Sequence, residues 1–255
     1  MPVRTIPAAI ALGLMVAVAP FPAFAEPIKN VVIVHGAFAD GSGWRKVSDI
    51  LSANGYRVSI VQEPETSLAD DVAATRRVLA LQDGPAVLVG HSYGGMVITE
   101  AGRDDKVAAL VYVAAFQPER GETLAALGAS KPVPGADPHA IKATPDGYLY
   151  LDPKAFPAAF AADLPKAEAD FLARSQVFTA KGAFTTAVGE PAWKAKPSWA
   201  IVAMQDRSIN PDLEREMAKR AGSRVREVDS SHAVYLSHPG AVAEVIAEAA
   251  TAPAK

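Results

Sequence analysis

The stretch Val87-Leu88-Val89-Gly90-His91-Ser92-Tyr93-Gly94-Gly95-Met96 decides the fold of this chain. An apolar run ends in glycines around Ser92, and a segment compatible with a helix follows at once. This order of strand, turn and helix is the context in which a G-x-S-x-G pattern forms a nucleophile elbow. Gly90 and Gly94 lack side chains, so the strand and the helix can pass close together. The pattern predicts that the Ser92 hydroxyl projects from the carboxyl edge of a sheet, beside helix N–H groups that favour negative charge.

Short apolar runs of the kind found in buried parallel strands recur along most of the chain. Segments with helical spacing of apolar residues separate them. Strands that alternate with helices imply a mostly parallel sheet of about six strands, with helices on both faces and ligand chemistry at the carboxyl ends of the strands. The chain is therefore expected to have an α/β fold, with strands over residues 31–34, 57–61, 86–90, 107–114, 199–204 and 225–228.

The alternation stops between residues 117 and 196, which we call the cap segment. Eight prolines between residues 132 and 191 punctuate it, and a connection of this length within a compact domain is usually a functional lid or cap. We expect a helical cap here, inserted before the penultimate strand, and a core made of residues 26–116 and 197–255. Aromatic side chains are expected to shape an apolar pocket over Ser92, although each could instead belong to a small core of the cap. They are Phe38, Tyr93, Phe156, Phe160 and Trp193.

The first 25 of the 255 residues predict a signal peptide. Arg4 gives the positive start, residues 8–19 the apolar centre, and Ala23-Phe24-Ala25 a small-x-small cleavage site. The apolar centre is shorter than the ~20 residues that a membrane-spanning helix needs. We therefore expect cleavage after Ala25, export to the periplasm or the medium, and no membrane span.

Composition excludes several classes of function. The chain carries 25 Lys and Arg against 28 Asp and Glu, so it has no basic excess for binding nucleic acid. It contains no cysteine, which excludes thiol catalysis and thiolate metal sites. It also lacks an H-E-x-x-H motif and the glycine-rich motifs of nucleotide binding, so we expect neither a metal nor a cofactor.

Two further residues complete a catalytic pattern with Ser92. A nucleophilic serine needs a base to take its proton, and that base needs a carboxylate to hold its tautomer. Asp206 follows the penultimate predicted strand and His232 follows the last one. The order Ser, Asp, His along the chain is the α/β-hydrolase order. Asp229 is the rival acid, but it lies three residues before His232 on the same strand and would have to fold back sharply.

The other four histidines are expected to have structural or surface roles. His35 should hydrogen-bond the backbone of the loop after the first strand. His91 flanks Ser92 but should point elsewhere, because neighbouring residues on an elbow diverge. His139 lies in the proline-rich cap segment and should be solvated, and His238 precedes Pro239 at a capping position.

Four pieces of the chain resemble the α/β-hydrolase superfamily. More narrowly, they resemble the group that contains plant methyl esterases, hydroxynitrile lyases and many bacterial esterase-like proteins. The similarity covers nearly all of the chain after the signal peptide, and it is weakest in the cap segment. The pieces are His35-Gly36-Ala37 to Trp44, Gly90-His91-Ser92-Tyr93-Gly94-Gly95, Ala114-Ala115-Phe116-Gln117-Pro118 and Ser231-His232-Ala233-Val234-Tyr235-Leu236-Ser237.

The resemblance implies roles for five residues. Ser92 would be the nucleophile, His232 the base and Asp206 its partner. The backbone N–H groups of Ala37 and Tyr93 would form the oxyanion hole.

The chain departs from that group in two ways. The first strand that the sequence predicts is the one before His35, so we expect the first two strands of larger members to be missing. Ala233 also stands where the lyases of this group carry a lysine that stabilises cyanide.

The sequence therefore predicts a serine hydrolase that needs no cofactor and cleaves a small carboxylic ester, such as an aryl or methyl ester. Two alternatives stay open. One is a lyase or a C–C bond hydrolase that uses the same three residues. The other is a non-catalytic protein that binds a small ligand on this scaffold.

Overall fold

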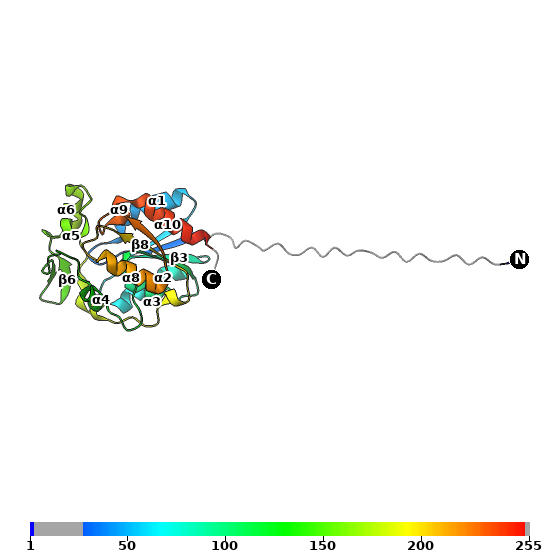
Figure 1. Cartoon of the computed structure of the whole chain (residues 1–255), viewed down its shortest axis with the longest axis horizontal. Coiled ribbons are helices and arrows are strands. Elements are labelled where there is room, and N and C mark those ends of the chain that lie inside the picture. The colour runs from blue at the N-terminus through cyan, green and yellow to red at the C-terminus, as the bar shows by residue number, and fades with distance from the viewer. Residues whose placement is uncertain (3–27, 253–255) are drawn as a thin grey trace.

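A parallel sheet forms the centre of the molecule (Figure 1). The structure is a computed structural model and describes residues 1–2 and 28–252; the predicted cleavage site and nearly all of the predicted signal peptide lie outside them. The sheet has six strands in the order β2-β1-β3-β4-β8-β9, and every pairing within it is parallel. This confirms the expected mostly parallel sheet of about six strands.

The strands of this sheet lie within a few residues of their predicted positions. β1, β3, β4 and β8 are buried along most of their length because helices cover both faces, whereas the edge strands β2 and β9 are partly exposed. Their bounds are β1 Asn30–Val34, β2 Arg57–Val61, β3 Ala86–Ser92, β4 Val107–Ala115, β8 Ser198–Ala203 and β9 Arg224–Val228.

Helices cover the two faces of the sheet (Figure 1). One face carries α1 (Arg45–Ala53) and α10 (Pro239–Thr251), and the other carries α2 (Leu68–Ala80), α3 (Gly94–Ala101) and α8 (Pro211–Ala221). A 3₁₀ turn, η1 (Gly41–Trp44), precedes α1, and the short α9 (Val234–Ser237) precedes α10.

Side chains and turn residues define the ends of these helices. The Ser67 side chain accepts a hydrogen bond from the backbone N–H of Asp70 at the start of α2, as the capping pattern in the sequence predicted. Asn210 caps α8 in the same way, and Pro211 begins the helix. Gly222 ends α8 with a φ of 67°, a left-handed conformation that glycine adopts without strain.

The cap segment lies between β4 and β8, at one end of the molecule (Figure 1). It contains the predicted helices and also a three-stranded antiparallel sheet, β5-β6-β7, that the sequence did not indicate. These strands have two to four residues each, too short to show the alternating pattern by which strands are recognised. Its elements are α4 Leu124–Ser130, β5 Ile141–Ala143, β6 Tyr148–Leu151, α5 Phe156–Phe160, α6 Lys166–Arg174, β7 Thr179–Ala180, α7 Lys181–Thr185 and η2 Ala192–Lys194.

None of the helices within the described ranges has both the length and the apolar character needed to cross a bilayer.

Candidate active site

Ser92 lies on the tight turn between β3 and α3. Its φ is 52°, in the left-handed region that a residue with a side chain rarely adopts. The turn is possible because Gly90 and Gly94, two residues away on either side, lack side chains. A Cβ atom on Gly90 would lie 2.6 Å from the carbonyl oxygen of Gly94, and one on Gly94 would lie 2.5 Å from the carbonyl oxygen of His35. The strand and the helix therefore pass as closely as the glycine pattern predicts.

His232 and Asp206 form a buried pair at the carboxyl end of the sheet. The Nδ1 atom of His232 lies 2.6 Å from Oδ2 of Asp206, and the two residues are 1% and 3% exposed. The other Asp206 oxygen accepts the backbone N–H groups of Ser208 at 2.7 Å and Ile209 at 2.9 Å, which fixes the carboxylate in place. Because Nδ1 donates its proton to Asp206, Nε2 is the nitrogen left free to accept one.

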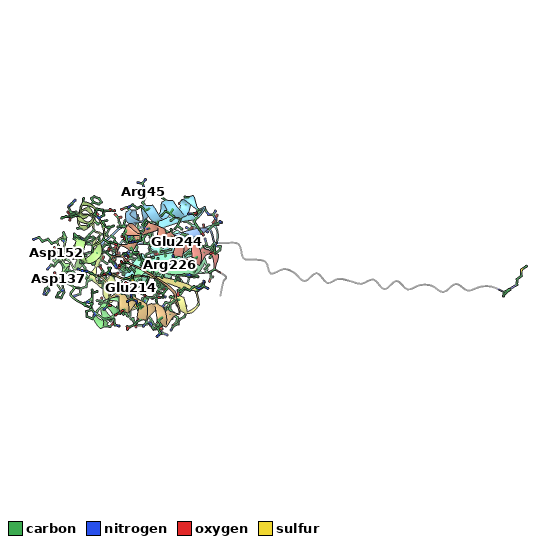
Figure 2. All side chains as sticks on the ribbon, turned by 45° about the horizontal axis from the view of Figure 1, so that its top comes forward. Arg45, Asp137, Asp152, Glu214, Arg226 and Glu244 are labelled. Atoms are coloured by element: carbon green, nitrogen blue, oxygen red, sulfur yellow. The ribbon has the colours of Figure 1, made fainter. Side chains whose placement is uncertain are left out.

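Two other carboxyl groups lie near this pair. Asp229 is exposed and accepts a hydrogen bond from the Gln205 side chain at 3.1 Å, so it is not the partner of His232. Glu214 of α8, labelled in Figure 2, is buried on the Asp206 side of the pair. Burial, and then the negative charge of Asp206, raise the pKa of Glu214 well above its ordinary value.

Ser92 and His232 line the same cavity, which has a volume of about 680 Å³. Helices α4 and α5 of the cap segment form much of its wall, and most of the lining side chains are apolar. Among the charged residues that line it are Arg207 and Asp137, both exposed. Asp137 lies at the cap end of the molecule (Figure 2). The fold thus brings the half-buried Ser92 and the imidazole of His232, paired with Asp206, together at an apolar cavity.

Ala37 and Tyr93 also line this cavity. Among the described residues, neither backbone N–H has a hydrogen-bond acceptor. Buried backbone donors are nearly always satisfied, so two free N–H groups beside Ser92 suit a ligand oxygen that carries negative charge.

The aromatic residues expected over Ser92 are only partly where they were predicted. Phe38 and Phe160 line the cavity, but Phe156 and Trp193 do not, so their expected place in its wall is wrong. Phe156 stacks behind Phe160, with ring centroids 4.8 Å apart. Trp193 lies on η2, which packs against α3, and its ring N–H donates to the carbonyl oxygen of Pro118 at 2.8 Å. Phe184 lines the cavity instead.

His91 does not line the cavity, but it contacts His232, which the sequence did not predict. Its Nε2 lies 3.1 Å from the backbone oxygen of His232, and the two ring centroids are 4.6 Å apart. The carbonyl can only accept, so Nε2 carries the proton and donates it. Burial lowers the pKa of His91 well below its ordinary value, so the ring stays neutral beside His232.

The remaining histidines are structural or exposed. His35 lies 3.1 Å from the carbonyl oxygen of Gly36, which confirms its expected contact with the backbone of the loop. His139 is exposed, as predicted. His238 occupies the position before α10, but its side chain makes no capping hydrogen bond; its Nδ1 lies 2.9 Å from the Ser237 hydroxyl instead.

The structure brings together a group of buried acids that sequence reasoning missed. One ligand atom each from His35, Glu63 and Glu65 lies within 4.8 Å of the others, as in a metal site. However, Nε2 of His35 accepts the backbone N–H of Glu63 at 3.0 Å. Nδ1 must then carry the proton, so it cannot bind a metal while that bond holds. The signal was present in the sequence, because both acids lie within four residues of the end of the strand predicted over residues 57–61.

The comparisons with known proteins agree with this geometry. A family model described as the alpha/beta hydrolase family matches residues 31–245. A pyrethroid hydrolase from Sphingobium wenxiniae is 29% identical over 260 residues, covering 89% of this chain and 90% of that protein. A carbendazim hydrolyzing esterase from Nocardioides is 39% identical over 114 residues, but the match spans only 38% of this chain and 46% of that esterase.

Solved structures show the same architecture. A crystal structure of a pyrethroid hydrolase aligns with a TM-score of 0.75 and 26% identity, covering 89% of this chain and 99% of the other. A methylesterase from Arabidopsis aligns with a TM-score of 0.71, 20% identity and coverage of 87% and 98%, which supports the fold alone. Because the family model covers most of the chain, this protein belongs to the alpha/beta hydrolase family.

Proposed function

We propose that this protein is a serine carboxylesterase that hydrolyses small esters with bulky apolar groups. The observation that carries the proposal is the shared cavity. Ser92 and His232 both line this cavity, and Nδ1 of His232 is hydrogen-bonded to Asp206. A nucleophile, a base and an orienting acid in this relation are the parts that acyl transfer requires.

The reaction would proceed in two steps. Ser92 Oγ attacks the ester carbonyl while His232 Nε2 takes its proton, and the N–H groups of Ala37 and Tyr93 stabilise the oxyanion. The tetrahedral intermediate collapses as His232 gives the proton to the leaving alcohol, which leaves the acyl group on Ser92. Water, deprotonated by His232, then attacks this acyl-enzyme and releases the carboxylic acid.

The cavity favours apolar substrates. Its volume of about 680 Å³ and its mainly apolar lining match pockets that bury drug-sized molecules. Relatives named as a pyrethroid hydrolase and a carbendazim hydrolyzing esterase support an ester or ester-like substrate. We also propose that the protein is exported and that its signal peptide is cleaved after Ala25.

Ala233 argues against the lyase alternative. This residue follows His232 directly and is completely buried, so no cation stands there to stabilise cyanide. A C–C bond hydrolase would use the same three residues, so only its substrate distinguishes it from an esterase.

A substrate panel tests the proposal. Purified protein is assayed with p-nitrophenyl esters of increasing acyl size, with mandelonitrile and with a vinylogous diketone. We expect hydrolysis of the esters only, and loss of that activity in Ser92→Ala by several orders of magnitude. Ser52→Ala is the matched control, because Ser52 is exposed on α1 and does not line the cavity. Ester hydrolysis that survives in Ser92→Ala, or cleavage of mandelonitrile in preference to esters, would contradict the proposal.

A further inference from the structure

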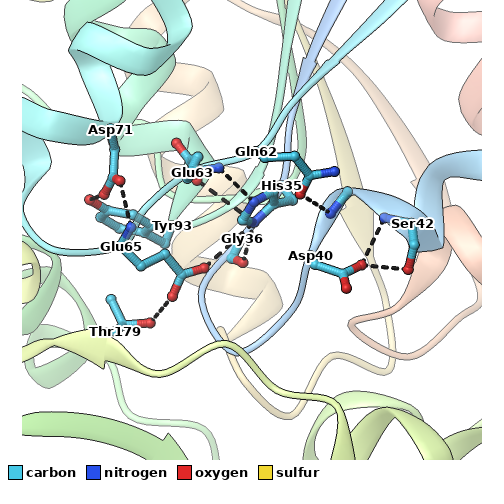
Figure 3. A network of polar contacts seen from close by, with 11 residues as sticks. His35, Gly36, Asp40, Ser42, Gln62, Glu63, Glu65, Asp71, Tyr93 and Thr179 are labelled. Atoms are coloured by element: carbon cyan, nitrogen blue, oxygen red, sulfur yellow. Dashed lines mark hydrogen bonds and ion pairs between the residues drawn. The ribbon is translucent and has the colours of Figure 1, made fainter.

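The side chain of Tyr93 is anchored by a buried carboxylate. Its hydroxyl donates to Oδ2 of Asp71 at 2.5 Å, and both residues are 0% exposed (Figure 3). Asp71 lies in the first turn of α2, whereas Tyr93 lies at the start of α3. The bond therefore connects the two helices that pack side by side on one face of the sheet.

The second oxygen of Asp71 holds a strained loop. Oδ1 accepts the backbone N–H of Glu65 at 2.8 Å, and Glu65 has a φ of 52°. A non-glycine residue holds such a conformation only when its surroundings fix it. Both oxygens of Asp71 are thus used, one for the loop that precedes α2 and one for Tyr93.

Glu65 extends this connection to the cap segment. Its carboxyl group accepts a hydrogen bond from the Thr179 hydroxyl (Figure 3). Its backbone carbonyl oxygen accepts the N–H of Ala180 at 2.8 Å. Thr179 and Ala180 form β7, the last strand of the small antiparallel sheet. Asp71 is therefore the junction between the cap segment and the turn that carries Ser92.

The polarity of the Tyr93–Asp71 bond is fixed by its surroundings. Burial raises the pKa of Tyr93 above its ordinary range, so the phenol keeps its proton and acts as the donor. Asp71 already accepts the Glu65 N–H, so two donors converge on this one carboxylate. Two hydrogen bonds on different oxygens leave the carboxylate one orientation, and this orientation sets where the Tyr93 ring lies.

We propose that Asp71 is a positioning residue for the oxyanion hole. By holding the Tyr93 side chain, it fixes the backbone of Tyr93 so that its N–H faces the cavity beside Ser92 before the substrate arrives. Preorganised donors stabilise an oxyanion because they need no rearrangement during the reaction, and loss of one typically lowers kcat by about 10²–10³-fold. This inference rests on the proposed function, because it assigns Asp71 a role in that same reaction.

The test is a double-mutant cycle of Asp71→Ala and Tyr93→Phe. Tyr93→Phe removes only the hydroxyl and keeps the backbone N–H, so both single variants break the same bond. We expect each to lower kcat by roughly 10–100-fold, less than complete loss of a donor, with KM changed less than about threefold. The double variant should be no slower than the slower single variant, because the two residues act as one unit. Affinity for a boronic acid that mimics the tetrahedral intermediate should fall in parallel with kcat.

Two further variants separate positioning from folding. Asp70→Ala is the matched control: Asp70 is the neighbouring, exposed carboxylate that bonds Thr66 and Ser67, and its loss should leave kcat within about twofold of wild type. Asp71→Asn can still accept from Glu65 N–H and donate to the Tyr93 oxygen, so it should recover part of the kcat lost in Asp71→Ala. If Asp71→Ala does not fold, Tyr93→Phe and Asp71→Asn still decide the question.

Several outcomes would overturn the inference. They are full kcat in Tyr93→Phe, additive losses in the double variant, and a loss confined to KM. Failure of the proposed function is recognised separately, by ester hydrolysis that persists in Ser92→Ala. If Ser92 is essential and the Asp71 and Tyr93 variants keep wild-type kcat, only the positioning role is wrong.

Discussion

The Nδ1 atom of His232 lies 2.6 Å from Oδ2 of Asp206, and both side chains are shielded from solvent. Two backbone N–H groups hold the other Asp206 oxygen, so the carboxylate cannot turn away from the imidazole. The ring of Phe160 packs edge-on against His232, with centroids 4.9 Å apart, and His91 donates to the backbone of His232. The imidazole is thus fixed from several sides, and Nδ1 is the ring nitrogen that Asp206 holds.

The first prediction concerns which carboxylate serves His232. Asp206→Asn keeps the shape of the side chain but favours the wrong tautomer of His232, so kcat for ester hydrolysis should fall by roughly 10⁴-fold. Asp229→Asn is the matched control and should leave kcat unchanged, because Asp229 is exposed and bonds Gln205. Steady-state kinetics on a p-nitrophenyl ester measure both. Equal losses in the two variants would contradict the assignment.

The second prediction concerns the glycine after the elbow. A Cβ atom on Gly95 would lie 2.0 Å from the carbonyl oxygen of Phe116, a backbone atom that cannot move aside as a flexible side chain can. Gly95→Ala should therefore lower the free energy of unfolding by about 3 kcal/mol or more. A Cβ atom on Gly240 of α10 would meet nothing within 4 Å. Gly240→Ala should therefore raise the free energy of unfolding by up to about 1 kcal/mol. Urea denaturation compares the two, and a Gly95→Ala protein as stable as wild type would refute the tight packing of β4 against α3.

The third prediction concerns the wall of the cavity. Ala125 and Ala126 are neighbouring exposed residues of α4, but only Ala125 lines the cavity. Ala125→Trp should raise KM for esters with bulky acyl groups by about tenfold, because the indole occupies space that the substrate needs, while p-nitrophenyl acetate is hydrolysed as before. Ala126→Trp should change neither. If both variants discriminate against bulky esters equally, the substrate lies elsewhere.

The fourth prediction concerns pH and the buried acid Glu63. Burial raises the pKa of Glu63 well above 4.5, and the charges of Asp71 and Glu65 raise it further. The folded protein therefore holds this proton more tightly than the unfolded chain does. The resulting stability is complete below about pH 4.5 and is lost as the pH rises through the folded-state pKa.

Glu63→Gln removes this titration. We expect the free energy of unfolding of wild type to decrease more steeply between pH 5 and pH 9 than that of Glu63→Gln, measured by chemical denaturation. The lowered pKa of His91 acts in the opposite direction, since its contribution is lost as the pH falls below 6.5. That contribution is common to both proteins and cancels in the difference. Identical pH slopes would show that Glu63 keeps its charge when buried.

Much of the site could be predicted because its residues follow strands. Ser92, Asp206 and His232 each lie within four residues of the end of a predicted strand, and the carboxyl ends of parallel strands meet at one edge of the sheet. The glycines around Ser92 predicted the close approach of strand and helix for a purely steric reason. These inferences needed only local sequence and one rule of topology.

Other features depend on tertiary packing, which the sequence does not display. We expected Trp193 in the wall of the pocket because it is an aromatic residue of the cap segment. Its place is set instead by a hydrogen bond to Pro118, far away in the sequence. The contact of His91 with His232 joins residues 141 positions apart. In the same way, Asp71 meets Tyr93 only because α2 and α3 pack together. Contacts of this kind leave no periodic pattern in the sequence.

Covalent trapping tests the central claim most directly. The intact protein is treated with a fluorophosphonate, digested and analysed by mass spectrometry, with Ser92→Ala treated in parallel. Our account predicts one phosphonyl group per molecule, located on Ser92, with simultaneous loss of ester hydrolysis and no labelling of Ser92→Ala. An unlabelled wild-type protein, or a label on a different serine that abolishes the activity, would contradict it.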